Sequence, residues 1–187
     1  DYKKWGYEDY HAMAFYATST FIPFVELSIR YSRLIDLPSE LYESTVGDRM
    51  ASARVRPLKE GKYHPSVVVG LQNFFTTLES GAASHFNSSY IVATKNFHFS
   101  GIFSRVGVTA GYGAELFSSA DYQFIGLFGG INISPKNMEW LELMMEYDAD
   151  KWNAGMRLTI LKHVVLLAGL EGLDAFSFGV NYRFRLP

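Results

Sequence analysis

Charged side chains recur at alternate positions along this sequence, and the chemistry that such spacing allows is ion pairing on one face of a sheet. In the segment 25–31, Glu26 and Arg30 fall on the same side because side chains of an extended strand alternate between two faces. The same spacing recurs to the end of the chain. The predicted charged face comprises Glu26, Arg30, Asp48, Arg54, Arg56, Lys95, Arg105, Glu142, Glu146, Asp148, Arg157, Arg183 and Arg185.

Two interpretations of this charged face are open. In the first, side chains of both signs form an ion-pair network that fills the lumen of a barrel too narrow for a wide pore. In the second, the face forms a polar conduit or a lumen that binds sugar. We favour the first, because a barrel of about twelve strands encloses a small bore that long side chains can close.

Enzymatic and metal chemistry have weak support in the sequence. His85 lies in one long loop with Ser84, Ser88 and Glu79, which allows the alternative of an outer-membrane enzyme that modifies lipid or sugar. The five histidines lack the short spacings of metal ligands, and the chain has no cysteine. We therefore expect a protein that is not an enzyme and that has no metal site and no cofactor.

The opposite face of the strands is apolar, and we expect it to contact lipid. A soluble ligand-binding barrel, with this face enclosing a cavity, is the alternative. We favour lipid because the alternation recurs about every 12 to 15 residues with aromatic residues at its ends, which is typical of transmembrane barrels. The residues predicted to face lipid are Val25, Leu27, Ile29, Tyr31, Val106, Val108, Leu141, Leu143, Phe176, Phe178, Val180, Tyr182 and Phe184.

Composition agrees with a barrel and argues against other classes. Aromatic residues make up 16% of the chain while the mean hydropathy is +0.00, as expected when apolar and polar residues alternate. The sequence contains no run of about 18 apolar residues, which is the length that a transmembrane helix needs. The net charge is −2 and no long run of one sign occurs, so we expect no nucleic-acid partner.

Eleven strand signals and their connections define the predicted architecture. The three longest connections are 36–47, 76–88 and 113–122. Two strands separate each of them from the next, so all three lie at the same end of the sheet. A barrel with both termini at the other end needs one more strand, from residues 1–7 or from chain outside this sequence. We therefore predict one all-β domain over 1–187, a transmembrane antiparallel up-and-down β-barrel of about 12 strands (range 10–14). The strand signals cover 11–21, 25–35, 48–56, 66–72, 90–97, 101–112, 123–133, 139–147, 152–160, 164–171 and 176–186.

Short motifs recur along residues 20–185. The most specific motif runs from Leu58 to Gln72, with the pattern L-K-E-G-x-Y-x-P-x-x-x-x-G-L-Q. The others are Pro23-Phe24-Val25-Glu26 with Arg30-Tyr31, Gly47-Asp48-Arg49, Ser88-Ser89-Tyr90 with Val92-Ala93-Thr94-Lys95, Phe128-Gly129-Gly130 and Glu146-Tyr147-Asp148. Together these motifs resemble the YjbH-type (GfcD-type) outer-membrane proteins associated with exopolysaccharide or capsule production.

This resemblance implies a location in the outer membrane of a Gram-negative bacterium and a role in exopolysaccharide or envelope biogenesis. The expected partners are outer-membrane lipid, other outer-membrane or periplasmic proteins, and polysaccharide. We expect a lumen largely closed by charged side chains, with the protein acting in biogenesis or as an accessory subunit of a larger complex. A small polar channel or porin is the remaining alternative.

Overall fold

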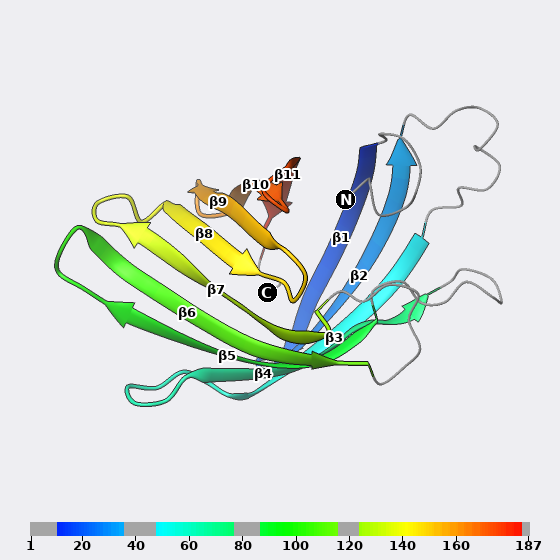
Figure 1. Cartoon of the computed structure of the whole chain (residues 1–187), viewed down its shortest axis with the longest axis horizontal. Coiled ribbons are helices and arrows are strands. Elements are labelled where there is room, and N and C mark those ends of the chain that lie inside the picture. The colour runs from blue at the N-terminus through cyan, green and yellow to red at the C-terminus, as the bar shows by residue number, and fades with distance from the viewer. Residues whose placement is uncertain (1–10, 36–47, 77–86, 116–123, 185–187) are drawn as a thin grey trace. The chain divides into compact units, whose positions relative to one another are not determined.

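The computed structural model describes residues 11–35, 48–76, 87–115 and 124–184, and this part of the chain is all-β, with no helix (Figure 1). Eleven strands follow one another from β1 to β11. Their bounds are β1 His11–Ile22, β2 Val25–Ile35, β3 Asp48–Leu58, β4 Ser66–Thr76, β5 Ser88–His98, β6 Phe103–Ala114, β7 Gly126–Pro135, β8 Leu141–Tyr147, β9 Trp152–Ile160, β10 Val164–Glu171 and β11 Ala175–Tyr182.

The strands form one up-and-down sheet in which each strand pairs with its neighbours in sequence. The pairing is antiparallel: Tyr16 lies opposite Arg30 in β1 and β2, and Glu142 lies opposite Arg157 in β8 and β9. The predicted antiparallel sheet is thereby confirmed. Among the described strands β1 and β11 do not pair, so closure into a barrel and the twelfth strand stay predictions. Residues 1–7, the proposed source of that strand, lie outside the described residues.

Contacts divide the chain into two compact units. The first unit takes Asp1–Pro57, Val68–Ile91 and Gly113–Ile125. The second unit takes Leu58–Val67, Val92–Tyr112 and Gly126–Pro187. The prediction of a single domain stays a prediction.

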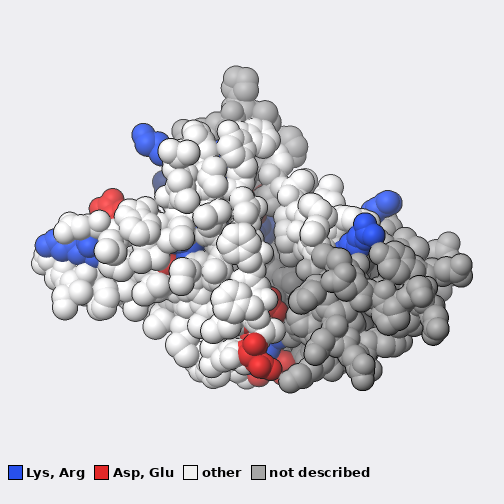
Figure 2. Space-filling model, turned by 90° about the horizontal axis from the view of Figure 1, so that it is seen from above, with Lys and Arg blue, Asp and Glu red and all other residues white. Residues whose placement is uncertain are grey.

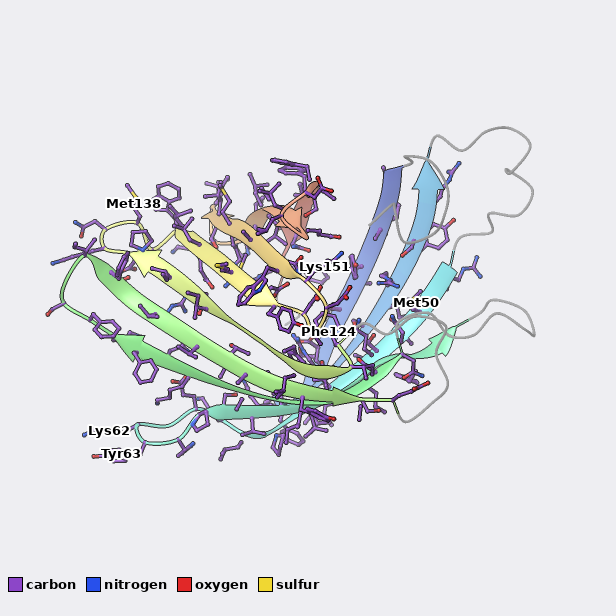
Figure 3. All side chains as sticks on the ribbon, viewed as in Figure 1. Met50, Lys62, Tyr63, Phe124, Met138 and Lys151 are labelled. Carbon is purple, nitrogen blue, oxygen red and sulfur yellow. The ribbon has the colours of Figure 1, made fainter. Side chains whose placement is uncertain are left out.

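Several predicted strand ends are wrong, and local backbone conformation explains two of them. The strand expected from residue 123 begins only at Gly126, because Phe124 has a positive φ of 57°, which lies outside the extended region of a regular strand. The strand expected from residue 139 begins at Leu141, after a turn in which Asn137 has a φ of 63°. Figure 3 marks Phe124 immediately before β7 and Met138 in the turn before β8.

The last strand is shorter than predicted. It ends at Tyr182 rather than at residue 186, so its apolar run within the strand is shorter than the six alternating residues expected. Beyond it, the backbone N–H of Arg183 donates to the carbonyl of His163 at 2.8 Å, and His163 Nδ1 lies 3.0 Å from the carbonyl of Arg183. The chain after β11 is therefore fastened to the turn between β9 and β10.

Large apolar side chains are mostly exposed along the described strands. Only Met50 and Val165 are buried apolar residues there, at 3% and 1% exposure. Figure 2 shows a face on which most described residues carry no charge and the charged side chains appear in small groups. No helix among the described residues is long and apolar enough to cross a membrane.

Candidate functional site

A buried carboxylate on β8 gathers side chains from four successive strands of the second unit. Glu142 is 7% exposed, and its Oε2 lies 2.8 Å from Arg105 Nη2 and 2.5 Å from Arg157 Nη2. Asn132 Nδ2 donates to Oε1 of the same carboxylate, and Arg105 Nη2 also lies 3.2 Å from the hydroxyl of Ser134. We call these five residues the Glu142 cluster.

The Glu142 cluster is built by period-two alternation across β6, β7, β8 and β9. Both oxygens of the carboxylate are engaged, which is the condition under which a charge is tolerated away from water. Two guanidinium groups face one carboxylate, so the cluster carries one excess positive charge. Its chemistry is that of an ion-pair network, because none of its members is a nucleophile activated by a neighbouring base.

Gly107 makes room for the amide of this cluster. A Cβ placed on Gly107 would collide with Asn132 Oδ1 and would also press on Asn96 Oδ1. The bare backbone of β6 therefore lets the amides of β5 and β7 approach it from both sides. Close backbone approach is a common reason for glycine inside a strand.

The turn between β3 and β4 is held to β5 by a second group of polar contacts, which we call the Glu60 clamp. Glu60 Oε1 accepts a hydrogen bond from the backbone N–H of Asn96 at 2.8 Å, and Oε2 accepts one from Asn96 Nδ2 at 2.7 Å. Lys95 Nζ lies 3.3 Å from Glu60 Oε1 and donates to the carbonyls of Gly61 and Lys62 at 2.5 and 3.2 Å.

The Glu60 clamp stabilises the charged form of its carboxylate. The hydrogen bonds from Asn96 are the main cause, with Lys95 adding to them, and they lower the pKa of Glu60 from 4.5 to about 2. Outside the clamp, Lys62 and Tyr63 lie at the tip of the turn and point away from the strands (Figure 3). The clamp therefore fixes the base of the turn and leaves its tip exposed.

The first unit contains a pocket of about 230 Å³ on the polar face of its strands. Glu26 Oε1 and Arg54 Nη2 form an ion pair of 2.6 Å across β2 and β3. We call this cavity the Arg54 pocket. Its lining residues are Tyr16, Glu26, Ser28, Arg30, Ser52, Ala53, Arg54, Gln72, Asn73 and Tyr90.

An irregularity in β4 gives the Arg54 pocket two adjacent amide side chains. Asn73 has a φ of 49°, so Gln72 and Asn73 both line the pocket although neighbours in a regular strand face opposite ways. Asn73 is 2% exposed, and its backbone N–H donates to the hydroxyl of Ser52 at 3.0 Å. Asparagine tolerates this backbone conformation better than most residues.

A glycine positions the aromatic wall of the pocket. A Cβ on Gly70 would collide with the phenol ring of Tyr90 from β5, so the ring lies directly over the Gly70 backbone. This contact places Gly70, part of the long motif that begins at Leu58, beneath the pocket.

The structure separates the predicted charged residues into these groups and a remainder. Lys95 belongs to the Glu60 clamp, Arg105 and Arg157 to the Glu142 cluster, and Glu26, Arg30 and Arg54 to the Arg54 pocket. Arg30 also contacts the sulfur of buried Met50. That these groups belong to one network stays a prediction.

Four of the remaining predicted charges have described side chains outside these groups. Arg56 is exposed and donates to the carbonyl of Pro23, and Arg183 is exposed beyond β11. Glu146 is exposed, whereas Asp148 is 8% exposed and caps a turn by accepting the N–H groups of Asp150 and Lys151. The side chains of Asp48 and Arg185 lie outside the described residues.

The residues predicted to face lipid are exposed or half-buried. Val25, Val106 and Leu141 are half-buried. The most exposed are on or beside β11, where Phe176, Phe178, Val180, Tyr182 and Phe184 range from 62% to 77%. The others, each with between 36% and 61% of its surface exposed, are Leu27, Ile29, Tyr31, Val108 and Leu143.

The catalytic alternative falls largely outside the described residues. Glu79, Ser84 and His85 all lie there, and Ser88 is fully buried at the start of β5. Among the residues that are described, no group of three or more His, Asp or Glu side chains is placed to hold a metal ion. The prediction that the protein is not an enzyme stays a prediction.

Several polar residues of these groups are absent from the sequence-based prediction. Alternation of charges does not identify four members of the three groups, which are Glu60, Asn96, Asn132 and Tyr90. Of these, Glu60 belongs to the most specific motif. Three of them are neutral, so a search for alternating charges passes over them. One signal in the sequence could have identified these three: each is a polar side chain on the face of its strand that carries charged residues on the neighbouring strand.

Comparison with protein-family models yields a match that covers nearly all of the chain. A family model described as "YjbH: Exopolysaccharide biosynthesis protein YbjH" matches residues 4–185. Comparison with curated proteins found no match, and comparison with solved structures found none either.

Proposed function

Because the chain belongs to the YjbH family of exopolysaccharide biosynthesis proteins, we propose that it is a non-enzymatic outer-membrane β-barrel protein that serves exopolysaccharide and envelope biogenesis. In this proposal the sheet closes into a barrel of about twelve strands in the outer membrane of a Gram-negative bacterium. The apolar face contacts lipid and the polar face lines a lumen that its own side chains largely close.

The observation that carries the proposal is the opposite character of the two faces of the sheet. On β11, Phe176, Phe178 and Val180 are 77%, 71% and 62% exposed. On the other face Glu142 is buried between two arginines. Exposing large apolar side chains to water is unfavourable and marks a surface that meets lipid or a partner, whereas ion pairs suit an enclosed interior.

Lipid-phase quenching tests the membrane placement. The chain has no cysteine, so single-cysteine variants at neighbouring positions can carry a fluorophore. In lipid vesicles, the probe at Phe178→Cys should be quenched by lipids with a quencher on the acyl chain. The matched probe at Ser177→Cys, on the opposite face, should not. Equal quenching at both positions, or a protein that stays soluble without detergent, would contradict the proposal.

The proposal includes a role as an accessory subunit of a larger membrane assembly. Its support is the exposed tip of the β3–β4 turn, where Tyr63 is 87% exposed beside Lys62. A photocrosslinking residue at position 63 should capture a specific envelope protein in cells. The control is position 173, an exposed apolar site in a turn at the other end of the strands. Identical products from both positions would count against a specific partner.

A further inference from the structure

The Arg54 pocket contains side chains suited to a small polar ligand. Tyr16 and Tyr90 supply aromatic faces with a hydroxyl at the edge, and Gln72 supplies both a donor and an acceptor. Aromatic faces pack against the C–H faces of a sugar ring, while amides and hydroxyls bind its hydroxyl groups. The wall of this pocket therefore offers both kinds of contact that a sugar requires.

The charge of the pocket distinguishes among sugars. Arg30 and Arg54 are its two cationic lining residues, and Glu26 is its one anionic lining residue. The Glu26–Arg54 ion pair balances one positive charge, which leaves an excess of one over the lining as a whole. Guanidinium groups bind carboxylates well because their N–H groups match the two carboxylate oxygens. The lining therefore favours an anionic ligand over a neutral one.

The volume of the pocket suits one sugar ring rather than several. Its volume of about 230 Å³ is below the roughly 300–1,000 Å³ of pockets that enclose drug-sized ligands. A chain of several sugars would extend out of it. The irregular backbone at Asn73 and the bare backbone of Gly70 both shape this small space, and irregular strands are common beside binding sites.

We propose that the Arg54 pocket binds a single acidic sugar residue, a hexuronate, at the end of an exopolysaccharide. The carboxylate lies toward Arg30, the ring packs against Tyr90, and Gln72 binds ring hydroxyls. The choice of a sugar rests on the proposed role in exopolysaccharide production, whereas the charge and the size are properties of the pocket itself.

Saturation-transfer NMR on the full chain in detergent tests this inference with two probes, methyl glucuronoside and methyl glucoside. The acidic sugar should give the stronger signal and compete with free glucuronate. Arg30→Gln should weaken binding of the acidic sugar about tenfold, the size expected for loss of a hydrogen bond to a charged group. Glu26→Gln should strengthen it, because the pocket then loses its own negative charge.

A matched control and a second variant keep the test decisive. Arg33→Gln removes the same charge from the same strand at an exposed position outside the pocket and should leave binding unchanged. If Arg30→Gln fails to fold, Gln72→Ala serves as the second variant, and it should weaken the binding of both sugars. No binding, or equal binding of the acidic and neutral sugars, overturns the inference. The lipid-quenching result at position 178 is independent of this outcome, so failure of the pocket and failure of the membrane proposal are distinguishable.

Discussion

Glu60 and Asn96 are joined by two hydrogen bonds, one to the backbone and one to the side chain of Asn96, although 36 residues separate them in sequence. This contact fastens the β3–β4 turn to a strand that is not part of its hairpin. Lys95 adds an ion pair and two hydrogen bonds to the same turn. The most specific sequence motif of the chain thus contains a structural clamp.

The Glu60 clamp should loosen in acid. The pKa of Glu60 is about 2 in the folded protein and 4.5 ordinarily, so its contribution to stability is fully present above about pH 4.5 and is lost as the pH falls toward 2. The amide resonances of Asn96 should shift with a midpoint near pH 2 in an NMR titration. In Glu60→Gln this titration should vanish, and a midpoint near 4.5 in the unaltered protein would contradict the prediction.

Removing the carboxylate of the Glu142 cluster should destabilise the protein strongly. Glu142→Ala leaves Arg105 and Arg157 facing each other without their anion, and loss of one partner from a buried ion pair costs about 3–5 kcal/mol. Because both guanidinium groups are about a third exposed, we expect roughly 3 kcal/mol, near the lower limit of that range. Urea unfolding in lipid vesicles, followed by tryptophan fluorescence, measures the change.

The control for the Glu142 cluster is Glu146→Ala on the same strand. Glu146 is exposed and its side chain meets Asn153 only at 3.4 Å, so we expect a change within about 0.5 kcal/mol. Equal losses of stability for the two variants would show that the buried ion pairs do not stabilise the sheet.

Gly70→Ala should disturb the Arg54 pocket. The added methyl group displaces the Tyr90 ring, and overpacking of this kind costs about 1–3 kcal/mol. Binding of methyl glucuronoside should fall together with the urea midpoint. Gly101→Ala is the matched control, because an added Cβ there meets only open space. A Gly70→Ala protein that binds the sugar normally would show that the Tyr90 ring does not form the pocket wall.

The closed lumen of the proposed barrel can be tested by electrical recording. Twelve strands are fewer than the roughly 16–18 of barrels with aqueous channels, and Arg105 and Arg157 extend across the polar face to one carboxylate. Purified protein in a planar bilayer should therefore give no stable, large conductance. Such a conductance would instead favour the small-channel alternative, and Arg105→Ser should then increase it further.

Period-two alternation was sufficient to predict the strands and their order, because each strand pairs with its sequence neighbour. The exact ends depend on single backbone angles that residue type does not determine. Phe124, at a φ of 57°, is an example, since aromatic residues rarely adopt this conformation. Alternation also predicted that Glu26 and Arg54 share a face, and they form an ion pair.

The amides of the site could not be predicted in the same way. Asn96 and Asn132 have no charge to mark them, and their positions depend on Gly107, which lies between them on β6. Asn73 faces the pocket because of an irregular backbone, which reverses the side that alternation assigns to it. Contacts of this kind depend on close approach between strands and are fixed only in three dimensions.

The neighbour-by-neighbour order of β1 to β11 has a consequence for folding and for divergence. Each new strand needs only the preceding one as a template, so pairing can spread along the chain with short loop closures, which favours faster folding than long-range pairing does. Duplication or loss of a whole hairpin leaves the order of the other strands intact. Changes of two strands at a time are therefore the length changes that this architecture accommodates with the least rearrangement.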